Sequence, residues 1–212
     1  MPEIERLSNA IDWIDVSFVE RERTPRWAIE LGIRCHLSGM SLRDTSQFLG
    51  ELGVQRSHVA VHSWVHKAEL QLASSVTADQ LAVDEKLIRL HGQECWLSGA
   101  VDPQTNEIVA LSLFPTTNEV TTRWFLDKLH RRCSLADVTI LVDGADYLLG
   151  VRAEDSYRCH YLPTGSRNSV ERVFRDVERR TSSFSNSFSH VERKTAQSWL
   201  DAFAVYHNSR QT

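Results

Sequence analysis

The chain has 212 residues, of which 42% are hydrophobic and 25% are charged. That length suits one sizeable core plus a small appended module, and the composition is ordinary for a globular protein. The longest apolar stretches, such as residues 138–142, have the length of a strand and are far too short to cross a bilayer. The first residues lack the basic start and apolar run of a signal peptide. We therefore expect a cytoplasmic protein that has no membrane partner.

The cysteines and the charges exclude further classes of protein. The four cysteines are scattered and form no CxxC pair, which argues against a disulfide framework or a structural zinc site. A net charge of −4 by itself disfavours nucleic-acid binding, because phosphate contacts need cations. The distribution of the cations matters more than their sum.

Residues 1–70 are predicted to be helical. Apolar residues at positions 4, 7, 11 and 14 have helical spacing, and Pro25 begins a second helix that runs to about Leu37 and ends near Gly39. A polar joint at residues 73–79 separates this part from the next.

The middle of the chain changes to the period of strands. Residues 81–84, 95–101 and 108–114 each read as strands joined by turns, which predicts a three-stranded meander. A helix is expected from about Asn118 to Arg132. It precedes an apolar strand that ends at Asp143 and has the continuous character of a strand buried on both faces.

The remaining residues are predicted to form two helices, one from about 168 to 180 and one around residues 196–203. The resulting order of elements is typical of a ribonuclease-H-like fold. We therefore expect an α/β protein, with a ribonuclease-H-like domain over residues 79–212 that has a mixed five-stranded sheet with helices. An all-α region over residues 1–72 precedes it. Fold alone does not give function.

Residues 41–68 have the pattern of a helix-turn-helix. Ser41 is a good helix N-cap, Gly53 permits a sharp turn, Val54 can fill the corner, and Ser57 can cap the second helix. In this motif the second helix enters the major groove of DNA. The predicted DNA contacts on it are Gln55, Arg56, Ser57, His58, His62 and Lys67. An ordinary helical hairpin is the alternative interpretation.

Histidines recur at every fourth position of the second helix, at His58, His62 and His66. No cysteine or carboxylate cluster accompanies them, and closed metal sites need about four ligands. We therefore expect a stripe that faces solvent or phosphate and holds no metal.

Three carboxylates occupy positions suited to metal chemistry. Asp84 lies within an apolar strand, Asp143 closes the strand 138–142, and Glu171 lies at the edge of the apolar face of a later helix. Cutting and joining phosphodiester bonds uses two Mg²⁺ ions about 3.5–4 Å apart, held by a few carboxylate oxygens. Each acid alone has an adequate structural explanation, and the three together in this element order predict a catalytic metal site.

Other acids are second choices. Glu85 points away from Asp84 by strand alternation, and Asp102 sits in an Asp-Pro turn. Asp146 and Glu178 lie one or two helical turns from a preferred ligand. The helix of Glu171 also carries arginines, among which Arg167, Arg172 and Arg175 are predicted to contact DNA phosphates. A solvated charged face is the alternative.

Several blocks of the sequence carry a family resemblance, which covers nearly the whole chain. They include residues 53–57, 82–85, 100–103, 142–145 and, the most specific, the Asn-Ser-Val-Glu-Arg-Val-Phe-Arg block at 168–175. With these blocks the chain resembles DDE transposases of the insertion-sequence-six type, particularly the short forms of salt-loving archaea.

The resemblance implies catalysis by Asp84, Asp143 and Glu171, with Mg²⁺ as the cofactor or Mn²⁺ in its place. It also implies that the substrates are double-stranded DNA, both the terminal inverted repeats and the target. The reaction would be cleavage followed by strand transfer from a 3′-hydroxyl, in a homodimer or larger assembly in the nucleoid. Two alternatives stay open: a silent copy that only binds DNA, and a ribonuclease-H-like nuclease acting on RNA–DNA hybrids.

Overall fold

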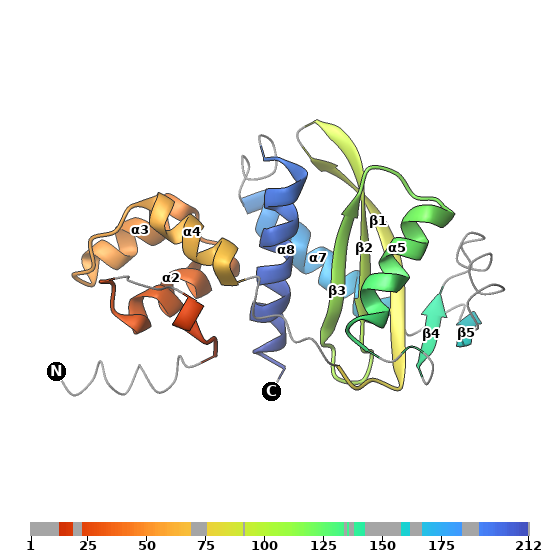
Figure 1. The fold of residues 1–212 in the computed structure, drawn as a ribbon. Helices are drawn as coiled ribbons and strands as arrows, with labels where there is room; N and C mark the ends of the chain where they lie inside the picture. The colour runs from red at the N-terminus through yellow and green to blue at the C-terminus, as the bar shows by residue number, and fades with distance from the viewer. Residues whose placement is uncertain are drawn as a thin grey trace.

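The computed structural model describes residues 13–18, 23–68, 76–90, 92–133, 135, 138–142, 158–161, 167–183 and 191–211. Figure 1 shows a helical N-terminal part on one side, the long helix α8 in the middle and a sheet with its helices on the other side.

The N-terminal part contains the 3-10 turn η1 (Val16–Phe18) and the helices α2 (Arg26–Ser38), α3 (Leu42–Glu51) and α4 (His58–Ala68). The helix predicted from Pro25 to Leu37 is confirmed, and Gly39 ends it with φ 128°, a conformation that favours glycine. The helix expected around residues 4–14 lies almost wholly outside the described residues.

The sheet is built from a meander and two further strands. Strands β1 (Gln80–Leu90), β2 (Gln93–Val101) and β3 (Ile108–Phe114) pair antiparallel in sequence order. Strand β4 (Thr139–Val142) pairs parallel with β1, and the four-residue β5 (Arg158–Tyr161) pairs parallel with β4. The order across the sheet is β3-β2-β1-β4-β5. The mixed α/β class is thereby confirmed, and β1 is longer than the predicted strand at residues 81–84.

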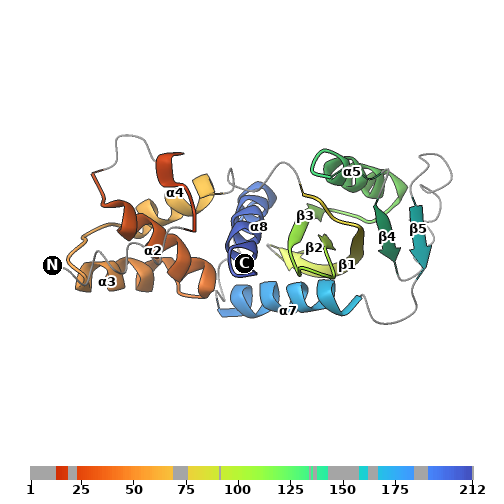
Figure 2. The ribbon, with the colours of Figure 1, turned by 90° about the horizontal axis from the view of Figure 1, so that it is seen from below.

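Helices cover both faces of this sheet. Figure 2 shows α5 (Glu119–His130) on one face and α7 (Arg167–Ser183) on the other. Asn118 caps α5 by accepting a hydrogen bond from the Thr121 amide at 3.1 Å, and Thr121 Oγ1 accepts one from the Asn118 amide.

Two apolar cores correspond to these two faces. The α5 core joins the odd-numbered β1 residues Leu81 and Val83 to Phe125, Leu126 and Leu129 of α5. The other core begins under α7 and continues through α8 (Arg193–Asn208) to the N-terminal helices. Trp64 of α4 and Phe203 of α8 are among its fully buried members.

Helix α8 also covers the free edge of β3. The side-chain amide of Asn208 accepts a hydrogen bond from the Ile108 amide at 2.8 Å and donates one to the Ile108 carbonyl at 3.0 Å. Further along β3, the side-chain amide of Gln197 accepts a hydrogen bond from the Leu113 amide and donates one to the Leu111 carbonyl. An exposed strand edge is a template for pairing with another chain, and these amides occupy it.

Among the described helices, none combines the length and the apolar character that crossing a bilayer would require.

Candidate active site and nucleic-acid interface

Asp84 lies midway along β1 on the face that α7 covers. Side chains alternate along a strand, so Asp84 shares a face with Ala82, which belongs to the core under α7. Its direct partner on β2 is Gly99. The carboxylate is half-buried, and its Oδ1 accepts a hydrogen bond from the Glu85 amide at 2.8 Å.

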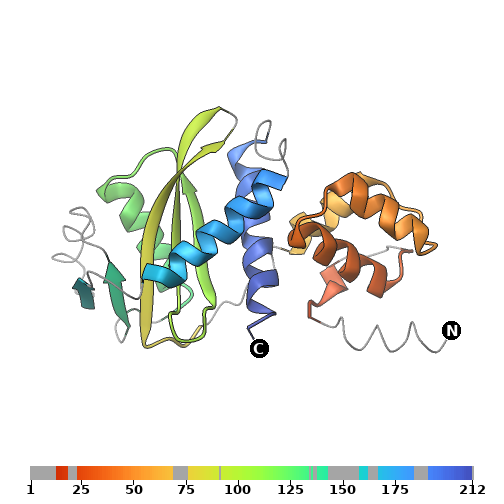
Figure 3. The same ribbon diagram turned by 180° about the vertical axis from the view of Figure 1, so that it is seen from behind.

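Helix α7 approaches the sheet most closely at Gly99. A Cβ at this position would come within 2.8 Å of Phe174 Cε1 and 3.2 Å of Val170 Cγ1. Figure 3 shows α7 crossing this face of the sheet. Glu171 lies one helical turn before Phe174, so the contact at Gly99 sets it beside the strand that carries Asp84.

The two acids line one pocket of about 330 Å³. Its lining residues are Asp84, Glu85, Lys86, Glu171, Phe174 and Arg175. Asp84 and Glu171 are 87 positions apart in the sequence (171 − 84), and the fold brings them to one pocket. Lys86 of this lining was not predicted from the sequence, although its position two residues after Asp84 on a strand puts it on the same face.

Strand β4 leads the chain towards the same place. Its pairing with β1 sets Gln80 beside Thr139, Leu81 beside Ile140 and Ala82 beside Leu141. Continued by one residue, this register sets Val142 level with Val83, the residue before Asp84. Asp143, the third predicted ligand, lies outside the described residues, and so does Asp146.

The donor set in the pocket suits a hard divalent cation. Asp84 and Glu171 offer carboxylate oxygens, which Mg²⁺ and Mn²⁺ prefer, and no thiol or imidazole is among the lining residues. Within the described part of the chain no group of three histidines, cysteines or acids is assembled for a metal. Asp84 and Glu171 thus have the donor chemistry of a hard-cation site, while a full set of ligands is not assembled among the described residues.

The rival acids have structural partners. Glu85 accepts a hydrogen bond from the Thr117 hydroxyl at 3.2 Å, Glu178 forms an ion pair with Lys86 at 2.8 Å, and Asp102 accepts the Gln104 amide at 2.7 Å. The turn function expected for Asp102 is what the structure shows.

The arginines of α7 fall into three environments. Arg175 is exposed and lines the carboxylate pocket. Arg172 is exposed and donates to the Asn106 side chain at 2.8 Å. Arg167 begins the helix, and its side chain lies outside the described residues. Arg180, which was not singled out, is buried and donates to the Leu37 carbonyl at 3.0 Å, tying α7 to α2.

The two helices predicted over residues 41–68 are present with their caps. Ser41 Oγ accepts the Asp44 amide at 3.0 Å, Ser57 Oγ accepts the Ala60 amide at 3.3 Å, and Val54 is buried in the corner between the helices. Gly53 has φ 84° in the turn after α3, a backbone conformation that glycine adopts with little strain.

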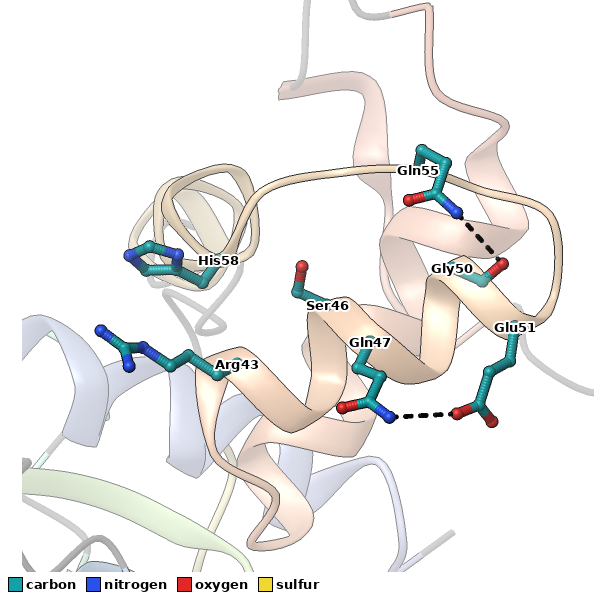
Figure 4. A pocket seen from close by; sticks show the side chains of 7 residues that line it. All are labelled: Arg43, Ser46, Gln47, Gly50, Glu51, Gln55 and His58. Carbon is teal, nitrogen blue, oxygen red and sulfur yellow. Dashed lines mark hydrogen bonds between the residues drawn. The ribbon is translucent and has the colours of Figure 1, made fainter.

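A polar groove of about 680 Å³ lies along these helices (Figure 4). Gln47 and Gln55 make hydrogen bonds within it, to Glu51 at 3.4 Å and to the Gly50 carbonyl at 3.5 Å. Arg43 and His58 lie near each other at one end. Its lining residues are Arg43, Ser46, Gln47, Gly50, Glu51, Gln55 and His58. Of the predicted DNA contacts it includes Gln55 and His58, and it adds Arg43, Ser46 and Gln47 of α3.

The remaining predicted contacts differ in accessibility. Ser57, His62 and Lys67 are exposed. Arg56 is half-buried: its Nε donates to Thr24 Oγ1 at 2.6 Å and one of its terminal nitrogens donates to the Gln55 carbonyl. The guanidinium of Arg56 is thus engaged inside the fold.

Two histidines of the α4 stripe, His62 and His66, are shifted towards their neutral forms. The Nε2 atoms of His62 and His66 are 2.9 Å apart. Burial, and then the neighbouring His62, lower the pKa of His66 to about 4. Burial, and then His58, also lower the pKa of His62. When both rings are neutral, one Nε2–H donates to the other Nε2, and the pair then adds no positive charge to the helix surface.

Comparisons with known proteins find a sequence relative and several solved structures of similar fold, two of which are described below. No family model matches the chain. An uncharacterised protein of Methanocaldococcus jannaschii is 28% identical over 206 residues, which covers 93% of this chain and 95% of that protein.

The solved structures include the HTLV-2 integrase catalytic core domain in complex with magnesium, with a TM-score of 0.45 and 12% identity, covering 61% of this chain and 85% of that one. They also include a simian T-cell lymphotropic virus intasome in complex with PP2A regulatory subunit B56 gamma. That likeness has a TM-score of 0.48 and 10% identity, covering 74% of this chain and 63% of that one. Both TM-scores are below 0.5, and the fold of the chain is defined by its own strand order and helix placement.

Proposed function

We propose that the chain is a DDE transposase of the insertion-sequence type, which cleaves DNA at terminal inverted repeats and joins the 3′-hydroxyl end to a target. The observation that carries the proposal is the shared pocket of Asp84 and Glu171. It supports the proposal because the sequence resemblance selected these two acids, and only folding brings them together.

The two carboxylates, together with Asp143, hold Mg²⁺ in this proposal. The bound metal supplies charge neutralisation at the attacking and leaving oxygens of an in-line displacement at phosphorus. Asp84 provides a ligand on the rigid middle of β1, and Glu171 provides one on α7. Ligands on a strand and a helix are held in place before the substrate binds, so no further ordering of these side chains is needed for metal binding.

The neighbouring cations have positioning roles. Arg175 borders the pocket and is exposed, so it can donate two hydrogen bonds to a phosphate beside the scissile one. Lys86 is paired with Glu178 at 2.8 Å and orders the wall of the pocket between β1 and α7.

The helices α3 and α4 act as the DNA-binding part in this proposal. The groove along them presents an arginine, a histidine and two amides, the side chains that contact phosphates and base edges. Arg43 and Ser46 come from the first helix of the pair, which crosses the DNA backbone in helix-turn-helix complexes.

The test is a strand-transfer assay on an oligonucleotide with the terminal repeats that flank the gene, with Mg²⁺ and without it. We expect joined products for the wild-type chain and none for Asp84→Asn, Asp143→Asn or Glu171→Gln. Glu94→Gln is the control, since it removes an exposed acid that is paired with Arg89 and lies outside the pocket. Activity that survives the three substitutions would refute the mechanism.

The same assay separates the alternatives. Sequence-specific binding without cleavage under Mg²⁺ or Mn²⁺ would identify a silent copy that occupies the ends of the element. Cleavage of RNA–DNA hybrids in preference to duplex DNA would identify a ribonuclease-H-like nuclease.

A further inference from the structure

We infer that the outer face of α5 is a self-association surface, on which a second copy of this chain docks with its own α5 antiparallel across a two-fold axis. The inference concerns assembly alone and does not depend on the chemistry proposed above.

Two large apolar side chains on α5 are exposed to solvent. Trp124 is 59% exposed and Val120 is 55% exposed, and they lie four residues apart, on one side of the helix. The inward side of α5 is already buried against the sheet through Phe125, Leu126 and Leu129. The outward pair therefore adds nothing to the core, and an exposed tryptophan beside a valine is the signature of an interaction surface.

The sheet adds a third exposed apolar residue on this side of the molecule. Leu87 is 43% exposed, and strand alternation puts it on the α5 face with Leu81 and Val83. Of the five large apolar side chains that are exposed in the described part of the chain, three thus lie on the α5 side.

Charges on the same helix select an antiparallel copy as the partner. Acidic Glu119 precedes Val120, and basic Arg131 follows the helix as an exposed residue. Consider two such helices that lie antiparallel, with Arg123 of one copy level with Asp127 of the other. In an antiparallel pair the residue numbers that lie level have a constant sum, here 250, so Glu119 of one copy is level with Arg131 of the other.

A two-fold axis repeats each of these opposite-charge pairs, and it sets the two Trp124 rings next to the axis. Glu119 and Arg123 already approach each other at 3.4 Å within the helix, with both side chains well exposed. Surface pairs of this kind are weak, so they re-pair across an interface at little cost.

The location of this surface leaves the carboxylate pocket accessible. Asp84 and Glu171 lie on the α7 face of the sheet, and α5 covers the opposite face (Figure 2). A dimer through α5 therefore leaves the pocket of each copy open to solvent.

The experiment is sedimentation velocity of the full chain without DNA over a range of concentrations. We expect a wild-type dimer, and a dissociation constant at least about ten-fold weaker for Trp124→Glu. Trp124→Phe keeps the apolar contact and should retain the dimer. Val59→Glu is the matched control, because Val59 is 62% exposed on α4 and lies away from this face. Circular dichroism shows that each variant is folded.

Charge exchange tests the antiparallel register. Arg123→Asp alone and Asp127→Arg alone should each weaken the dimer several-fold, and the two together should restore it, since the exchange recreates both opposite-charge pairs. A monomeric wild-type chain, a dimer unaffected by Trp124→Glu, or a dimer abolished by Val59→Glu would each overturn the inference.

Discussion

Phe174 of α7 packs its ring directly on Gly99 of β2, the strand partner of Asp84. No side chain fits between the helix and the sheet at that point. Because Gly99 has no Cβ, α7 can approach the sheet closely, and this close approach sets the distance from Glu171 to the strand of Asp84.

Gly99→Ala should damage the pocket without touching either acid. Its Cβ would meet Phe174 Cε1 at 2.8 Å and Cζ at 3.1 Å, so α7 has to move outward. We expect a loss of about 1–3 kcal/mol in the free energy of unfolding, and a larger proportional loss of strand transfer. The measurements are denaturant unfolding and the strand-transfer assay. Phe174→Leu in the same chain should recover part of both; unchanged activity in Gly99→Ala alone would contradict this account of the pocket.

Divalent metal should stabilise the folded chain through the same pocket. At a concentration of Mg²⁺ or Mn²⁺ about a hundred times its dissociation constant, binding to the folded state alone adds about 2.7 kcal/mol. We expect the melting temperature to rise with metal for the wild type and for Glu94→Gln. For Asp84→Asn and Glu171→Gln we expect no rise. An equal rise in all four chains would place the metal elsewhere.

Arg56 and His58 should have separable effects on stability and on DNA affinity. The Arg56 guanidinium donates to Thr24 Oγ1 at 2.6 Å inside the N-terminal part, so Arg56→Ala should lower the melting temperature. His58 is exposed in the α3–α4 groove, so His58→Ala should weaken binding to a terminal-repeat duplex and leave the melting temperature unchanged. Thermal melts and electrophoretic mobility shifts measure the two properties. The reverse pattern would show that Arg56 is the DNA contact.

The stability of the chain should fall in mild acid through His36. Burial lowers the pKa of this histidine from 6.5 to about 4, an effect to which His62 and His66 add, while a contact of Nδ1 with the Met40 carbonyl at 3.0 Å opposes it. The unfolded chain therefore binds the proton first as the pH drops. The stabilisation is complete above pH 6.5 and is lost between there and about pH 4, at a cost of up to about 3 kcal/mol.

His36→Gln should make this part of the stability profile shallower, and the slope that remains comes from His66, whose pKa is also about 4. Urea unfolding at a series of pH values measures the profile. His130→Gln, which changes an exposed histidine of α5, is the control and should leave the profile unchanged. A wild-type profile that is flat between pH 6.5 and 4 would contradict the assignment.

The sequence was most informative where pattern and chemistry agree locally. Helices α2, α3, α4 and α5 begin within about a residue or two of their predicted starts, because Pro25, Ser41, Ser57 and Asn118 are helix-start signals that act within one turn. The pocket shared by Asp84 and Glu171 agrees with the element order, because an acid on the middle of the first strand faces the helix that packs there.

Features set by distant contacts were not accessible from the pattern. The second half of β1 begins with Asp84-Glu85-Lys86, which lacks apolar alternation, and its pairing with β2 decides its structure. The short β5, Arg-Cys-His-Tyr, was not located for the same reason. Arg56 and Arg180 read as surface cations, and only the folded structure reveals their internal hydrogen bonds, to Thr24 Oγ1 and to the Leu37 carbonyl.

The amides of Asn208 and Gln197 on the edge of β3 carry a consequence for biosynthesis. Asn208 lies 100 residues after Ile108, the residue to which it bonds. During synthesis the meander β1–β3 therefore leaves the ribosome with both edges uncovered. Strand β4 then covers the edge of β1, and the edge of β3 stays open until α8 has followed. An open strand edge on a nascent chain invites pairing with its neighbours on the same message. Fast translation of the segment between β3 and α8 would shorten that exposure, and stalling within it would favour aggregation over folding.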